Sequence, residues 1–89
     1  MFIRILRGQA YDGAATLAEV ARWRRELGAG VLGWQRLTAG IGEAGELVLA
    51  LRYDTEAAAR RDRDRPEPAA WQASAERHLT GPGRWYTAR

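Results

Sequence analysis

The residues of this chain that could do chemistry are few, and two of them lie on one expected helix. Trp71 and His78 are seven residues apart, so a helix would place both on one face with Ala75 between them. The indole of Trp71 could then stack on a flat substrate while the imidazole of His78 acts as a base or as a haem ligand. The alternative makes Trp71 a core residue and His78 a partly exposed residue near the helix end, where its cation suits the helix dipole.

Arginines flanked by apolar residues form a second group of candidates. A strand over 31–39 would place Trp34 and Arg36 on one face, and a strand over 2–8 would place Arg4 among apolar residues. A guanidinium stays charged, so each such arginine must find a carboxylate or leave the sheet. Arg36 could polarise a substrate carbonyl or phenolate in a pocket. It could instead pair across a dimer interface, where arginine is enriched.

The three tyrosines, Tyr11, Tyr53 and Tyr86, are the remaining candidates for proton transfer. Tyr53 closes one expected strand and Tyr86 lies within another, where tyrosines more often pack with one hydrogen-bonded hydroxyl group. The candidate catalytic residues are therefore His78, Trp71 and Arg36, and the candidate substrate contacts are Trp34, Tyr53 and Tyr86.

The composition excludes several classes of chemistry. The chain of 89 residues has no cysteine, which excludes disulfides, thiolate metal sites and thiol nucleophiles. It has no lysine, which excludes a Schiff base and the lysine of a phosphate-binding P-loop. His78 alone cannot supply the ligands of a usual zinc site. We expect neither a metal nor a cofactor.

Two glycine-rich segments, 28–33 and 40–45, match the G-x-G-x-x-G pattern of dinucleotide-binding loops. In such loops the glycines follow a strand and precede a helix, whose N-terminus meets the pyrophosphate. Here the first segment runs from an expected helix into a strand, and the second joins two strands. We interpret them as a helix cap at Gly28 and as a hairpin.

Charge and length favour one small domain, residues 1–89. All 14 basic residues are arginine and 11 acids are interspersed among them, so the net charge is only +3. The charged run from Glu56 to Arg65 is interpreted as a solvated helix face. An RNA-binding sheet would need aromatic residues on its central strands, where 46–53 offers mainly leucine, valine and alanine. No apolar run approaches the ~18 residues of a membrane span. We expect a cytoplasmic protein that binds neither nucleic acid nor membrane.

Hydrophobic patterning predicts strands over 2–8, 31–39, 46–53 and 84–88. A first helix is predicted from Thr16, with Thr16 as N-cap and Glu19 completing a capping box. Its expected buried stripe consists of Leu17, Val20, Trp23 and Leu27.

A second helix is predicted after Asp54 or Thr55, until Pro66 and Pro68 break it. A further helical segment is expected over about 68–79.

The resulting order β-α-β-β-α-β predicts an α+β, ferredoxin-like fold: a four-stranded antiparallel sheet with two helices on one face. The strand over 46–53 is apolar on both faces, so the face without helices also needs a cover. A second copy is the most economical cover. We therefore predict a homodimer through the open sheet face, a dimeric α+β barrel.

The chain also resembles a known family. The stretch Leu51-Arg-Tyr-Asp-Thr-Glu-Ala-Ala-Ala-Arg, followed by Asp64-Arg-Pro-Glu and Trp71, is similar to small dimeric α+β-barrel proteins of the antibiotic-biosynthesis-monooxygenase type, including uncharacterised actinobacterial ones. The resemblance implies two sheets packed face to face and a pocket between the sheet and the helices of each subunit. Members include cofactor-free quinone-forming monooxygenases, isomerases and haem-degrading oxygenases. The last group uses an Asn, Trp and His set, and this chain has no asparagine.

Two functions follow from these observations. The first is a cofactor-independent monooxygenase, or a related enzyme, acting on a small aromatic or polyketide-like molecule. An apolar pocket and one or two hydrogen-bond donors would stabilise a substrate anion that reacts with oxygen directly. The second is a non-catalytic dimeric module that binds a small ligand or a partner protein. An open pocket lined by tryptophan and arginine favours the enzyme, and a space filled by side chains favours the module.

Overall fold

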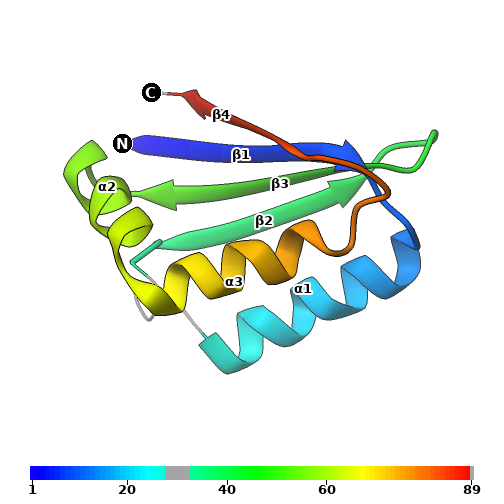
Figure 1. The fold of residues 1–89 in the computed structure, drawn as a ribbon, viewed down its shortest axis with the longest axis horizontal. Coiled ribbons are helices and arrows are strands. Elements are labelled where there is room, and N and C mark those ends of the chain that lie inside the picture. Colours follow the sequence, from blue (N-terminus) through cyan, green and yellow to red (C-terminus); the bar gives the residue numbers. More distant parts are fainter. Residues whose placement is uncertain (28–32, 89) are drawn as a thin grey trace.

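The computed structural model describes residues 1–27 and 33–88, and its elements follow the expected order (Figure 1). The strands are β1 (Phe2–Gln9), β2 (Arg36–Ile41), β3 (Glu46–Tyr53) and β4 (Arg84–Ala88), and the helices are α1 (Gly13–Leu27), α2 (Glu56–Asp64) and α3 (Pro66–Glu76). One sheet contains the strands in the order β2-β3-β1-β4, with each neighbouring pair antiparallel. The predicted ferredoxin-like α+β fold is confirmed.

The core lies on the face of the sheet that α1 and α3 cover (Figure 1). Along β3 the side chains alternate, so Leu49 and Leu51 are fully buried beneath the helices while Val48, on the other face, is 37% exposed. The register of β1 against β3 places Leu6 opposite Leu49 and Arg4 opposite Leu51, on the covered face. The opposite face carries no helix.

The first helix begins earlier than predicted, and Thr16 is not its N-cap. The cap is Asp12, whose Oδ1 accepts a hydrogen bond from the backbone N–H of Ala15 at 3.0 Å. Thr16 is buried inside the first turns and its hydroxyl donates to the Asp12 carbonyl. The buried face therefore contains Thr16, Val20 and Trp23, whereas Leu17 of the predicted stripe is 40% exposed.

The second strand also begins later than predicted, at Arg36 rather than in the segment from residue 31. Gly33 has φ +89°, a left-handed conformation that interrupts an extended strand. Residues 31 and 32 of the predicted strand and the predicted cap at Gly28 lie outside the described residues. The hairpin after β2 is confirmed, with Gly45 at φ +83° in its turn.

The break between α2 and α3 lies where the prolines predict it. Thr55 caps α2 by accepting a hydrogen bond from the backbone N–H of Ala58 at 3.1 Å. Arg65 is extended because the ring of the following proline makes the helical conformation of Arg65 unfavourable. Pro66 is then the first residue of α3. That helix ends at Glu76 rather than near 79, so His78 lies just beyond it. Within the described residues, no helix combines the length and apolar character needed to cross a membrane.

Replacing Asp12 by alanine tests the corrected start of α1. We expect Asp12→Ala to lower the free energy of unfolding by about 1 kcal/mol, because the N–H of Ala15 loses its acceptor. Asp12→Asn, which keeps a capping oxygen, is the matched control and should cost little. Urea unfolding measures both, and equal losses in the two variants would contradict the assignment.

Candidate functional site

Three tryptophans and the histidine gather where α1, α3 and the segment before β2 meet. Trp23 of α1 packs edge-on against Trp71 of α3, with ring centroids 5.2 Å apart, and against His78 at 5.9 Å. Trp34 lies tilted against Trp71 at 6.0 Å. The three indoles are buried and His78 is half-buried. The structure thus brings Trp34, Trp71 and His78 together through Trp23, which sequence analysis placed only in the core.

Two of these buried indoles have no hydrogen-bond acceptor among the described residues. They are those of Trp34 and Trp71, whose Nε1 atoms find no partner within 1–27 and 33–88. The Nε1 of Trp85, by contrast, donates to the Glu76 carboxylate at 2.7 Å. A buried donor left unpaired costs about 1–3 kcal/mol. An acceptor atom on a ligand would therefore be stabilised beside Trp34 and Trp71.

A buried tyrosine and aspartate link the end of β3 to α2. The Tyr53 hydroxyl, fully buried, donates to Oδ2 of Asp62 at 2.9 Å. Asp62 is 1% exposed, and Nη1 of Arg65 lies 3.8 Å from its other oxygen. Burial raises the pKa of the Asp62 carboxyl, against the lowering effects of the Tyr53 hydrogen bond and of the Arg65 and Arg4 charges. Burial and the contact with Asp62 likewise raise the pKa of Tyr53.

Sequence analysis missed Asp62, because it lies within the run interpreted as a solvated helix face. A signal was present: Asp62 follows Ala59 by three residues, so a helix places both on the same face, and both are buried. Which face of α2 meets the sheet could not be read from its composition, since Ala57, Ala58 and Ala59 are consecutive and point in different directions around the helix.

Arg4 is a buried cation on the covered face of the sheet. Its side chain lies over the ring of Trp85, with 4.5 Å from the guanidinium carbon to the ring centroid. The residue is 8% exposed, and its Nη1 has no hydrogen-bond partner in the part of the chain that the structure describes. Arg4 shares its strand face with Phe2 and Leu6, so it lies among apolar residues as expected. Its charge also favours the ionised forms of Tyr53 and Asp62.

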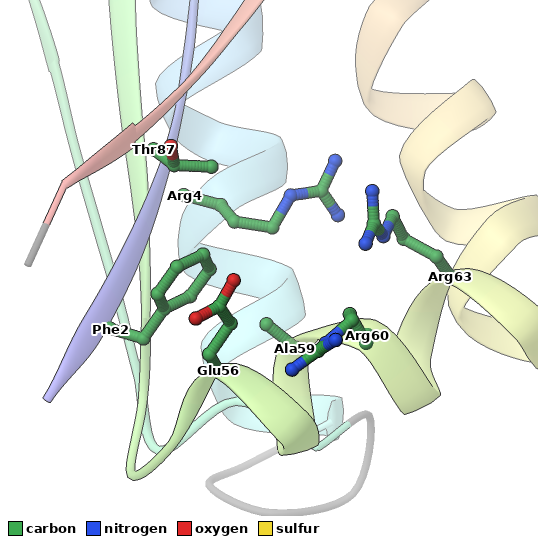
Figure 2. Close-up of a pocket in the computed structure, with 7 residues that line it drawn as sticks. All are labelled: Phe2, Arg4, Glu56, Ala59, Arg60, Arg63 and Thr87. Carbon is green, nitrogen blue, oxygen red and sulfur yellow. The ribbon is translucent and has the colours of Figure 1, made fainter.

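A pocket of about 160 Å³ opens beside Arg4, between α2 and the ends of β1 and β4 (Figure 2). The strands contribute Phe2, Arg4 and Thr87 to its wall. Helix α2 contributes four residues, which are Glu56, Ala59, Arg60 and Arg63. Figure 2 shows the guanidinium groups of Arg4 and Arg63 pointing toward one another across the pocket.

Arg36 and Tyr86 lie on the face of the sheet away from this site. Arg36 is exposed and stands opposite Arg52 in the β2–β3 register, and Tyr86 is 42% exposed. The expectation that Trp34 and Arg36 share a strand face is wrong, because Trp34 precedes the strand. Arg52 lies on this same face of the sheet, together with Val48 and Ala50. The structure therefore does not bring Arg36 or Tyr86 to Trp71.

Among residues 1–27 and 33–88, no group of three histidine, cysteine or acidic side chains could hold a metal ion.

The fold matches solved structures, although no family model and no curated protein matches the sequence. The monooxygenase from the gene ActVA-Orf6 of Streptomyces coelicolor, solved with the ligand nanaomycin D, superposes with a TM-score of 0.67 at 20% identity, covering 98% of this chain and 84% of that one. Rv0793 from Mycobacterium tuberculosis superposes with a TM-score of 0.64 at 21% identity, covering 99% of this chain and 92% of that one. A third structure is a mutant of SnoaB, a cofactor-independent oxygenase from Streptomyces nogalater. It superposes with a TM-score of 0.62 at 16% identity, covering 99% of this chain and 92% of that one. At these identities the likeness establishes the fold alone, a fold that this chain shares with solved structures described as antibiotic biosynthesis monooxygenases.

The buried carboxyl of Asp62 should give a specific pH dependence of stability. Folding raises its pKa, so the folded protein holds this proton more tightly than the unfolded chain does. The stability of the wild type should then fall relative to that of Asp62→Asn as the pH rises from about 4, near the pKa of an unfolded aspartate. Denaturant unfolding at several pH values measures the difference. Asp64→Asn, at an exposed position of the same helix, is the matched control. A difference independent of pH would contradict the burial of an ionisable Asp62.

Proposed function

We propose that this protein is a cofactor-independent oxygenase that binds a small aromatic molecule beside Trp34 and Trp71. The observation that carries the proposal is the pair of buried indole N–H groups without acceptors. Both indoles belong to one aromatic cluster, in which Trp71 packs against Trp34 and Trp23, and such a cluster suits a flat ligand. The likeness in fold to two proteins described as a monooxygenase and as a cofactor-independent oxygenase supports the same reaction class.

In this proposal the two N–H groups donate to a substrate oxygen that gains negative charge when the substrate loses a proton. His78, half-buried at the edge of the cluster, accepts that proton. The resulting carbanion reacts with molecular oxygen, so that a CH₂ group becomes a carbonyl. One oxygen atom enters the product, and the other leaves as water with the two hydrogens of the CH₂ group. The electrons that reduce oxygen come from the substrate carbon.

The remaining candidate residues take other roles in the proposal. Tyr53 is a positioning residue that acts through Asp62, because its hydroxyl is already bonded to that carboxylate. Arg36 and Tyr86 contact the partner subunit rather than the substrate, because they lie on the uncovered face of the sheet.

The edge-to-face packing of the tryptophans also suits the alternative, a module that binds without catalysis. In that case the indoles form a closed core, and a bound ligand is released unchanged. Oxygen consumption separates the two functions.

We expect oxygen uptake when the wild type is mixed with anthrone- or quinol-type substrates. Trp71→Phe keeps a ring and removes the unpaired N–H, so kcat should fall by roughly 10²–10³-fold, as after loss of an oxyanion donor. His78→Ala should lower it by roughly 10²–10⁴-fold, as after loss of a general base. An oxygen electrode measures each rate.

Trp85→Phe is the matched control, because the N–H of Trp85 already has a carboxylate partner. Its rate should stay near that of the wild type. Absence of uptake with every substrate, or equal losses in Trp71→Phe and Trp85→Phe, would count against the oxygenase.

The proposal includes a homodimer through the uncovered face of the sheet. That face is apolar at its centre, where the side chains are Ile3, Ile5, Val48, Ala50, Tyr86 and Ala88. Leaving several hundred Å² of such surface in water forfeits several kcal/mol at ~25 cal/mol per Å². Face-to-face packing of two copies about a two-fold axis removes it from water.

The charges on the uncovered face give the dimer a distinctive salt dependence. Arginines at positions 7, 36, 52 and 84 lie on that face, and Glu46 is its acidic residue, paired with Arg7. Two copies of a net positive face repel one another across the interface. Salt screens that repulsion, so the apolar contact should strengthen as salt is added.

Analytical ultracentrifugation should report about twice the chain mass of 9.9 kDa. The dimer should be tighter at ~1 M salt, where the screening length is only ~3 Å, than at low salt. Val48→Asp should give a folded monomer, because a carboxylate at the centre of the apolar face cannot be buried unpaired. Tyr11→Asp, at an exposed aromatic residue outside the sheet, should leave the dimer intact. A folded wild-type monomer would overturn this part of the proposal.

A further inference from the structure

We propose that the pocket between α2 and the ends of β1 and β4 binds a small organic anion, held through a carboxylate or phosphate group. Neither Trp34 nor Trp71 belongs to the lining of this pocket, so the inference is independent of the oxygenase reaction. Three arginines line it, Arg4, Arg60 and Arg63, against one carboxylate, Glu56.

Arg4 is the residue that points most directly to a ligand. It is more than nine-tenths buried, its charge is permanent, and its Nη1 has no acceptor. The ring of Trp85 covers one side of the guanidinium, and the planar group donates through its N–H edges. Figure 2 shows that the guanidinium extends into the pocket. A buried charged donor with an unfilled position is the site at which an oxyanion would be most strongly stabilised.

The approach of a second cation supports the same conclusion. Arg4 and Arg63 come from different elements, β1 and α2, yet their guanidiniums point toward one another in Figure 2. Two like charges facing each other in a partly enclosed space are unfavourable. An oxyanion between them turns this repulsion into two attractions, because each guanidinium can donate to a different oxygen.

The volume and the lining of the pocket limit the size of the carbon fragment attached to the anionic group. Its volume of about 160 Å³ is close to that of an engineered cavity which binds benzene. A single ring or a short carbon chain fits, and a multi-ring molecule does not. Phe2 and Ala59 form the apolar part of the wall, against which such a carbon fragment would pack.

Thermal unfolding in the presence of two probes, benzoate and inorganic phosphate, tests the proposal. Each is compared with sodium chloride at equal ionic strength. At ten times its dissociation constant, a bound probe should raise the Tm of the wild type by roughly 5–10 °C beyond the chloride value. If only phosphate raises the Tm, the ligand carries a phosphate group. If only benzoate raises it, the ligand carries a carboxylate. Both outcomes support the site.

Substitutions on α2 locate the site. Arg63→Gln should weaken probe binding, measured by calorimetry, by about tenfold or more, because a charged hydrogen bond is lost. Arg63 is exposed, so this variant should still fold. Arg61→Gln is the matched control, because Arg61 is an exposed residue of the same helix that does not line this pocket.

Three results would overturn the proposal. One is a Tm rise no larger than that in chloride for both probes. Another is unchanged affinity in Arg63→Gln, and the last is an equal loss of affinity in Arg63→Gln and Arg61→Gln, which would indicate a general charge effect. Activity plays no part in these readouts, so failure of the oxygenase assay leaves them interpretable.

Discussion

The hydrogen bond from Tyr53 to Asp62 holds α2 against the end of the sheet, and much of the molecule depends on where α2 lies. This helix has little apolar surface of its own, with Ala59 and Asp62 as its buried residues. A Cβ at Gly33 would clash with the Asp62 carboxylate, so the chain entering β2 passes close to Asp62 there because Gly33 has no side chain. Arg4 reaches the same region from β1 and offsets part of the buried negative charge. The contact between Tyr53 and Asp62 thus positions α2, the segment that leads into β2 at Gly33, and the wall that α2 contributes to the pocket.

Most of the fold could be predicted because its signals are local. Each of these signals depends on a few neighbouring residues. They are the alternation in β1 and β3, the glycines of the hairpin, the cap at Thr55 and the break at Pro66. The errors arose where two local signals competed. Asp12 and Thr16 are both good N-caps, and the hydrogen bond from Ala15 shows that Asp12 is the one used. Thr16 then lies on the buried face of α1, where the apolar pattern had predicted Leu17.

The candidate site was less predictable because its contacts join distant segments. The pairing of Trp23 with Trp71 depends on how two helices pack, and the burial of Asp62 depends on which face of α2 meets Tyr53. Trp34 and Arg36 were expected on one strand face, but Trp34 precedes β2, so the alternation of strand side chains does not relate the two residues. Residue type and spacing identified the aromatic residues, whereas the unpaired donors among them emerge only from the packed structure. Each buried N–H group without an acceptor lowers the stability of the folded protein.

The strand order has a consequence for how this protein avoids aggregation. Strands β2 and β4 are the two edges of the sheet, and each offers unpaired backbone groups to which a strand from another chain could add. Both edges carry an exposed arginine at their first residue, Arg36 on β2 and Arg84 on β4. Charge at an edge makes the stacking of copies strand upon strand unfavourable, because like charges would accumulate along a growing fibril. Open-ended growth along the two edges of the sheet is thereby disfavoured.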